Sequence, residues 1–363
     1  MPEQVYFYCC PAGSPNKQPY QHALICLAEG LRELNIPFYA DRNYWRLSPE
    51  SEEYLFNNNP DIGPDDCSIV VIDSEWVTFG NSLPSGLFHK SRKYATAYLE
   101  IGDLVQSNQS RFHSFDFIFR ASCSNKIHYP SNVHPYAYGL SNRIIEEVNN
   151  AKSSSGRENS LLINFRHTQH GHSVRKYVDT HFTSKIQRVL TLNAATDDTN
   201  NIPENQYHAM QWCQTGRRHY PQYYARLAAA KAVASFGGYF TFPWPTNQQS
   251  LPSRIARKLL SNSGRKSNLI LQWDSWRFWE SLASGCATFH IDFEKYGCRL
   301  PVMPENGRHY IGVDLDNIEQ TLTMIEDQPS WLETVGAEGQ KWVLNHYAPK
   351  QTAARFLEKV KAA

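Results

Sequence analysis

An excess of either charge is the first thing that this sequence lacks. Its 363 residues contain 36 Lys and Arg against 35 Asp and Glu, a formal net charge of +1 at pH 7. Domains that bind nucleic acid usually carry a basic face or tail, and no block of like charges occurs in this chain. We therefore expect no nucleic-acid partner.

Long apolar runs and paired cysteines are also missing. No stretch approaches the roughly 18 apolar residues with which a helix crosses a bilayer. The eight cysteines include no CxxC pair, and most lie inside apolar segments, which is typical of buried free thiols. The first residues, "MPEQVYFYCC", predict a strand rather than a signal peptide, because no basic segment precedes a long apolar core. We expect a cytoplasmic protein.

Two common nucleotide-binding motifs are absent as well. No GxGxxG follows the first predicted strand, which argues against a dinucleotide-dependent oxidoreductase, and no GxxxxGK[ST] occurs, which excludes a P-loop hydrolase. Aromatic residues, by contrast, are plentiful, with 20 Tyr, 18 Phe and 9 Trp. They suit either thick cores or stacking surfaces for ring-shaped ligands.

The chain is long enough for two domains, and its two halves repeat the same alternation of strands and helices. This pattern predicts an α/β fold with two Rossmann-like, parallel-sheet domains. We expect an N-terminal domain over 1–148, a polar linker over 149–160, a C-terminal domain over 161–345 and a terminal helix over 346–363.

Specific elements are predicted in the second half. Residues 220–238 show a long helical pattern that ends at a Gly pair. Residues 267–273, 276–284 and 286–292 predict a strand, a helix and a strand in succession. The first of these strands should deliver the chain to the carboxyl edge of a parallel sheet, where ligands bind.

The start of the helix at 276–284 is the strongest candidate site. Asp274 or Ser275 can cap it, and its remaining N–H groups and dipole favour an anion such as a phosphate. Helical side chains lean toward the N-terminus, so Glu280 should point to the same mouth, where a carboxylate suits the two hydroxyls of a ribose. Arg277 could meet a diphosphate. The alternative is an exposed ion pair between Arg277 and Glu280, worth a few tenths of a kcal/mol.

The stretch "DSWRFWESLASGCATF" resembles the donor-site signature of GT-B glycosyltransferases, particularly the exostosin-like and group 1 types. The matching positions are Ser275, Arg277, Glu280, Gly285 and Cys286. Upstream, "YYARLAAAKAVASFGG" is similar to a helix and strand of that family, and 309–343 resembles a short strand followed by a helix. The resemblance spans about residues 160–345. It implies the GT-B fold, with two sheets facing across a cleft and a C-terminal helix that crosses back.

The resemblance also implies roles for single residues. Glu280 would bind the ribose of the donor, and Arg166, after the first strand of the second domain, would contact its phosphates. Retaining group 1 enzymes carry an acid eight positions before the Glu; here Gln272 stands there, which leaves retention or inversion open. Such enzymes generally need no bound metal, and three His near Arg166 are weak evidence for one. We expect no metal and no cofactor, with a UDP- or GDP-linked sugar as substrate.

The remaining candidates follow from residue type and position. Arg217 could neutralise the leaving diphosphate. Asp73, at the end of a strong strand, could take the proton of the acceptor hydroxyl, although a turn-forming Asp is the simpler interpretation. Tyr44 and Trp45 could form a stacking platform for an acceptor sugar. The basic segment 254–266 could touch an anionic membrane surface or could be a solvated helix face.

These features predict a glycosyltransferase. Its C-terminal domain would hold a nucleotide-sugar donor, and its N-terminal domain a glycan, lipid-linked or protein acceptor. The alternative is a GT-B scaffold that binds a nucleotide, a glycan or a partner without turnover, which Gln272 in place of an acid would favour. Nucleotide binding without hydrolysis or transfer would distinguish the scaffold from the enzyme.

Overall fold

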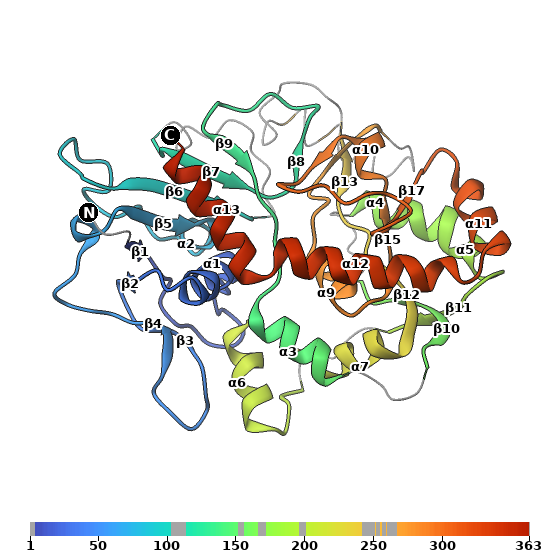
Figure 1. Cartoon of the computed structure of the whole chain (residues 1–363), viewed down its shortest axis with the longest axis horizontal. Helices are drawn as coiled ribbons and strands as arrows, with labels where there is room; N and C mark the ends of the chain where they lie inside the picture. Colours follow the sequence, from blue (N-terminus) through green and yellow to red (C-terminus); the bar gives the residue numbers. More distant parts are fainter. Residues whose placement is uncertain are drawn as a thin grey trace.

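Two parallel sheets, one in each half of the chain, form the framework of the molecule (Figure 1). The computed structural model describes residues 4–102, 114–151, 156–165, 172–195, 201–241, 251, 255, 259 and 267–362. The two-domain α/β architecture expected from the alternating pattern is confirmed.

The N-terminal sheet has the strand order β2-β1-β5-β6-β7-β9, and all neighbouring strands are parallel. Its strands are β1 (Val5–Phe7), β2 (Phe38–Ala40), β5 (Ile69–Asp73), β6 (Ala95–Glu100), β7 (Phe117–Arg120) and β9 (Val133–Pro135). Side chains alternate along β5, so Ile69 and Val71 pack in the same core as helix α1 (His22–Glu33). Val70 and Ile72 belong to a separate apolar cluster on the opposite face. The unbroken apolar run of β5 is therefore that of a strand buried on both faces.

The C-terminal sheet has the order β11-β10-β12-β15-β17 and is also parallel. Its strands are β10 (Glu158–Ile163), β11 (Thr191–Ala194), β12 (Ala230–Ala234), β15 (Ala287–Ile291) and β17 (Ile311–Val313). The chain order reverses between β10 and β12, because β11 lies on one side of β10 and the later strands lie on the other. Open parallel sheets bind ligands at such a reversal.

The single long helix predicted over 220–238 is wrong. Helix α7 (Pro221–Ala229) ends where Ala230 takes an extended backbone with ψ of 140°, and β12 follows at once. β12 lies between β10 and β15 in the middle of the sheet, so pairing on both sides and burial outweigh the helical propensity of its alanines. The helix and strand implied by the family resemblance agree with the structure at this point.

The strand predicted at 267–273 is present as β14 (Leu269–Leu271), but it lies outside the parallel sheet. It pairs antiparallel with β13 (Tyr239–Thr241) in a separate two-stranded sheet. The chain then enters α9 (Trp276–Ala283) and β15, which confirms the predicted helix and second strand. α9 is therefore part of the crossover from β12 to β15.

Further helices cover the two sheets, and shorter strands form one hairpin and one pair at the domain seam. The helices are α2 (Ser74–Thr78), α3 (Asn142–Asn150), α4 (Ser173–Val178), α5 (Ser184–Ile186), α6 (Gln206–Gln214), α10 (Phe293–Tyr296) and α11 (Ile318–Asp327). The short strands are β3 (Tyr44–Arg46), β4 (Tyr54–Phe56), β8 (Cys123–Ser124) and β16 (Cys298–Arg299). Ile144 and Val148 of α3 pack in the core of the C-terminal domain, so this helix joins the second domain before the polar linker begins.

The C-terminal helix crosses back to the N-terminal domain, as the resemblance implied. After α12 (Trp331–Tyr347), helix α13 (Pro349–Lys361) turns toward the N-terminal sheet and packs beside α1 (Figure 1). Its Phe356 is buried in the N-terminal core. The approach is closest at Gly30, where a Cβ atom would lie 2.1 Å from the carbonyl oxygen of Pro349. Only glycine leaves room for this crossing.

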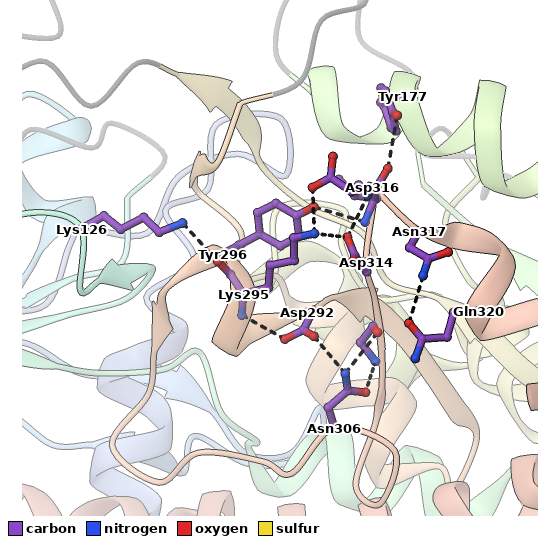
Figure 2. A network of polar contacts seen from close by, with 12 residues as sticks. Lys126, Tyr177, Asp292, Lys295, Tyr296, Asn306, Asp314, Asp316, Asn317 and Gln320 are labelled. Carbon is purple, nitrogen blue, oxygen red and sulfur yellow. Dashed lines mark hydrogen bonds and ion pairs between the residues drawn. The ribbon is translucent and has the colours of Figure 1, made fainter.

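A polar network and a short strand pair tie the domains together. β8 of the N-terminal half pairs antiparallel with β16 of the C-terminal half. The Nζ of Lys126 donates to the backbone carbonyl of Lys295 at 3.1 Å, and Figure 2 shows this side chain reaching across to Lys295. The ammonium of Lys295 in turn lies between the carboxylates of Asp314 and Asp316.

The prediction of buried free cysteines is confirmed, whereas the predicted membrane contact is not tested by the described residues. All eight cysteines are free and seven are buried, as their apolar surroundings predicted. Within the described part of the chain, no helix combines the length and apolarity needed to cross a membrane. The basic segment 254–266 lies outside the described residues except for Ile255 and Leu259, so its contact with a membrane stays a prediction.

Candidate functional site

A cavity of about 380 Å³ lies between the two domains, at the carboxyl ends of their strands. On the C-terminal side Asn164 follows β10 and Gly237 follows β12, so the cavity adjoins the reversal of strand order. On the N-terminal side Glu75 follows β5 and Gly102 follows β6. The fold thus places one cavity where both sheets are expected to bind ligands.

Helix α9 begins at this cavity, but neither predicted side chain caps it. Ser275 occupies the N-cap position without a side-chain cap, and its Oγ donates to the carbonyl of Ser235 at 3.5 Å. The carboxylate of Asp274 accepts from the backbone N–H of Tyr138 at 3.1 Å and from the indole of Trp279 at 2.7 Å. The capping prediction is wrong because the Ser275 hydroxyl bonds a backbone carbonyl of another segment and the Asp274 carboxylate bonds Tyr138 and the Trp279 side chain. The first N–H groups of α9 are therefore left without a side-chain acceptor.

Glu280 lines the cavity and is nevertheless buried, with 6% of its surface exposed. Its Oε1 accepts from the hydroxyl of Tyr224 at 3.1 Å, and that hydroxyl accepts from Nη1 of Arg143 at 3.1 Å. Burial raises the pKa of the Glu280 carboxyl, whereas the charges of Arg143 and Arg277 lower it. This carboxyl is an oriented acceptor at the base of the cavity.

Arg277 is anchored at the same edge of the sheet. Its Nε donates to the backbone carbonyl of Asn164, at the carboxyl end of β10, and its side chain lines the cavity. Because Glu280 is buried and bonded to Tyr224, the alternative of an exposed ion pair between Arg277 and Glu280 is wrong. Both side chains face the cavity, as predicted.

Three more guanidinium groups line the C-terminal side: those of Arg175, Arg217 and Arg218. Arg218 lies 5.4 Å from the centroid of the Trp276 ring, and Nε of Arg175 donates to the carbonyl of Phe236 at 2.8 Å. Sequence reasoning missed Arg175. The available signal was a basic residue in the first turn of the helix that follows the first strand of this domain. These cations make the cavity suitable for a phosphate-bearing ligand.

Two of the predicted residues hold strained backbones at the cavity. Arg217 has φ of 64° and Gln272 has φ of 52°, left-handed values that cost a non-glycine residue about 1 kcal/mol or more. Both residues line the cavity, and strained residues tend to gather at functional sites. Arg166 lies outside the described residues, so its contact with a phosphate stays a prediction.

The N-terminal side of the cavity is aromatic. The Tyr20 ring lies 5.1 Å from the Trp276 ring at 84°, and the Tyr138 ring lies 5.9 Å from it at 68°. The hydroxyl of Tyr20 accepts from Nη2 of Arg143 at 3.2 Å, which connects this wall to the network around Glu280. Sequence reasoning did not single out Tyr20 or Tyr138, because these rings come from separate segments with no shared motif.

The predicted stacking platform of Tyr44 and Trp45 is wrong. The two side chains are only 5% and 4% exposed, because the β3–β4 hairpin folds them into the N-terminal core. The Tyr44 hydroxyl donates to the carbonyl of Pro19 at 3.2 Å. Trp45 instead stacks behind Tyr20, with ring centroids 5.6 Å apart and planes at 27°. It supports a ring that lines the cavity and does not line the cavity itself.

Asp73 is fully buried below the cavity. Its Oδ1 accepts from Nε2 of Gln21 at 2.8 Å and from the backbone N–H of Trp76 at 3.3 Å, so it caps α2. Burial, with a smaller effect from the charge of Glu75, raises its pKa to about 8. These contacts agree with the simpler interpretation of Asp73 as a turn-forming residue. Glu75, two residues later, lines the cavity instead.

A cluster of Glu147, His208 and His219 brings three metal-ligand types together within 4.8 Å. Its hydrogen bonds do not suit a metal. Arg143 can only donate, so Nδ1 of His219, 2.9 Å from Nη1 of Arg143, must accept. Nε2 of His219 then carries the ring proton and donates to Nδ1 of His208 at 2.9 Å. With its lone pair already used, the buried His219 orients Arg143 rather than binding an ion.

Comparisons with known proteins show the fold. No family model matches the chain, and no curated protein matches it in sequence. A structure of an alpha-glucosyltransferase with UDP and a 13-mer DNA containing a central A:G mismatch has a TM-score of 0.51 at 8% identity, over 99% of both chains. AviGT4, a glycosyltransferase involved in Avilamycin A biosynthesis, scores 0.49 at 12% identity, over 99% of this chain and 97% of its own. An alpha,alpha-trehalose-phosphate synthase (UDP-forming) from Burkholderia vietnamiensis scores 0.49 at 8%, over 99% and 100%. The chain therefore has the GT-B fold, with two Rossmann-like domains facing across a cleft.

Proposed function

We propose that the protein is a glycosyltransferase that binds a nucleoside diphosphate sugar in the cleft. The observation that carries this proposal is the buried, oriented carboxyl of Glu280 in a wall that also presents four arginines. A carboxylate suits the vicinal hydroxyls of a ribose, and guanidinium groups suit a diphosphate. UDP is the first nucleotide to test, because the alpha-glucosyltransferase of similar fold was solved with UDP.

The reaction would use the two walls of the cleft differently. The bond between the sugar C1 and the diphosphate breaks, and Arg217, Arg218 and Arg277 oppose the charge that develops on the leaving group. The acceptor hydroxyl, held on the N-terminal wall, forms the new bond to C1. In an inverting displacement that hydroxyl loses its proton to a base, and we assign this role to Glu75 in place of Asp73, because Glu75 lines the cavity.

Donor binding is tested by calorimetry of the purified protein with UDP, GDP, ADP and CMP. We expect one of them to bind clearly more tightly, and Glu280→Ala to weaken that binding at least tenfold, which is about 1.4 kcal/mol. Unchanged binding in the variant, or no binding of any nucleotide, would contradict the proposal that Glu280 binds the ribose.

The catalytic assignment is tested with Glu75→Gln and Asp73→Asn. Once a donor is known, Glu75→Gln should lower the transfer rate by about 10² or more while nucleotide affinity stays within about twofold. Asp73→Asn, an isosteric change below the cavity, should keep most of the transfer activity. If Asp73→Asn lowered the transfer rate more than Glu75→Gln did, Asp73 and not Glu75 would be the base.

The alternative is a scaffold that binds a nucleotide without turnover, which Gln272 at the position of the family's acid favours. Tight UDP binding together with undetectable hydrolysis and transfer from a panel of UDP-sugars would select the scaffold. Release of UDP from one sugar nucleotide, lost in Glu280→Ala, would select the enzyme.

A further inference from the structure

A second cavity, of about 510 Å³, lies under the C-terminal helix on the seam between the domains. It is lined by β7 and β9 of the N-terminal sheet, by residues 299–301 at the end of β16 and just after it, and by α13. Its volume lies within the range of about 300–1,000 Å³ typical of small-molecule sites. None of the residues that line it also lines the cleft cavity, so within the described chain the two cavities are separate.

One side of this second cavity is an aromatic wall. The Phe119 ring lies 4.7 Å from that of Phe356 on α13 and 5.9 Å from that of Tyr136. Leu300 and Pro301 line it from the C-terminal domain. Such a wall suits the flat or aliphatic part of an organic molecule.

Two residues that line this cavity, Tyr136 and Thr352, carry buried hydroxyl groups without a hydrogen-bond partner among the described residues. Their side chains are 5% and 6% exposed. Buried polar atoms are paired in the great majority of cases, so these two unpaired hydroxyls are available to polar atoms of a ligand that enters the cavity. Tyr136 directly follows β9 of the N-terminal sheet and Thr352 belongs to α13, so the two hydroxyls come from different elements.

Positively charged side chains line the same cavity. The guanidinium of Arg355 lies 4.8 Å from the centroid of the Tyr347 ring, and its charge acts on Tyr136 as well. Arg299 and Lys359 are exposed on the cavity lining, and no ion pair joins any of these three cations to an acid in the described residues. Glu358 is the one acid on the described lining. His134 also lines the cavity, and burial together with the charge of Lys359 lowers its pKa. The lining therefore has an excess of positive charge.

We propose that this seam cavity binds a small organic anion. A phosphate or carboxylate head would lie between Arg355 and the hydroxyls of Tyr136 and Thr352, and a ring or short chain would lie on the aromatic wall. This site is separate from the proposed donor site, so an experiment can contradict one proposal and leave the other unaffected.

The proposal is tested by titrating the full chain with phenyl phosphate and with benzoate, and with benzyl alcohol as the uncharged probe. We expect saturable binding of at least one anion, about tenfold tighter than that of benzyl alcohol. The tighter anion identifies the head group. Saturating UDP should not displace it, since UDP is expected in the cleft. Displacement by UDP, equal binding of benzyl alcohol, or no saturable binding would overturn the proposal.

Variants locate the site. Arg355→Met should weaken anion binding about tenfold, and Tyr136→Phe about threefold. Arg299→Gln, an exposed change, should also weaken it and keeps the test valid if Arg355→Met does not fold. Lys350→Gln, on the same helix but away from the cavity, removes an equal charge and should leave binding unchanged. An equal loss in Lys350→Gln would mean that only the net charge matters and would overturn the proposal.

Discussion

The two walls of the cleft differ in how they are built. The C-terminal wall presents Arg277 and Glu280 from a single helix, three residues apart. The N-terminal wall presents Tyr20 before α1, Glu75 after β5 and Tyr138 before α3, from segments far apart in the chain. Two charged side chains on one helix leave a short sequence pattern, whereas an aromatic wall assembled from separate segments does not.

This difference explains why residues of the charged wall were predicted and those of the aromatic wall were not. Arg277 and Glu280 face the cavity because helix geometry sets their direction once α9 begins at the sheet edge. The adjacent aromatics Tyr44 and Trp45 predict a stacking platform, but a hairpin buries both and Tyr20 lines the cavity instead.

The largest expected effect tests whether the nucleotide belongs to the charged wall alone. Arg277→Met should weaken UDP binding about 10- to 100-fold, because a charge-assisted hydrogen bond contributes about 1.5–3 kcal/mol. Tyr138→Phe, on the aromatic wall, should change UDP affinity less than about threefold. Calorimetric titration of both variants with UDP measures the two losses of affinity. Similar losses would mean that the nucleotide spans both walls and that the division is wrong.

The next effect concerns the packing of the C-terminal helix on the N-terminal domain, which carries the aromatic wall. Gly30→Ala places a Cβ 2.1 Å from the carbonyl oxygen of Pro349, so α13 must shift away from α1. Overpacking of this kind should lower the free energy of unfolding by about 2 kcal/mol in urea titrations. Gly156→Ala is the matched control, because its Cβ meets nothing within 4 Å. If the two variants were equally stable, α13 would not be held tightly against α1.

A third test uses pH to examine the buried carboxyl below the N-terminal wall. The pKa of Asp73 is raised to about 8 in the folded protein, whereas an unfolded Asp titrates near its ordinary value. Between about pH 4 and 8 the folded state therefore binds the extra proton, and stability falls as pH rises, by about 1 kcal/mol per pH unit from this group. Asp73→Asn removes this group, so its free energy of unfolding should fall less from pH 5 to 8. Parallel profiles for variant and parent would contradict the raised pKa.

The smallest expected effect concerns the hydroxyl that orients Glu280. Tyr224→Phe should weaken UDP binding about three- to tenfold, the contribution of one hydrogen bond of about 0.5–1.5 kcal/mol. With 2′,3′-dideoxy-UDP the loss should disappear, because Glu280 then has no ribose hydroxyls to bind. Tyr54→Phe, whose hydroxyl bonds the exposed Glu52, is the control. A loss that persisted with the dideoxy nucleotide would show that Tyr224 acts on the fold and not through Glu280.

The fold was more predictable than the site. The buried run of β5, helix α9 and the terminal helix each follow from local periodicity. The alanine-rich segment at 226–234 does not, because the same residues suit a helix or a central strand and only the neighbours β10 and β15 select the strand. Arg175 and the network from Arg143 to Glu280 likewise depend on contacts between distant elements.

By itself the sequence determined two α/β domains, the helix that begins at the cleft and the direction of Arg277 and Glu280 on it, since strand burial and helix geometry are local properties. Only the tertiary structure decided that α13 would return across Gly30, that Asp73 would be buried while Glu75 lines the cavity, and that Tyr136, Thr352 and Arg355 would line one cavity on the domain seam. These features depend on which distant side chains compete for one buried space. That competition is settled by packing and desolvation, which no short sequence pattern records.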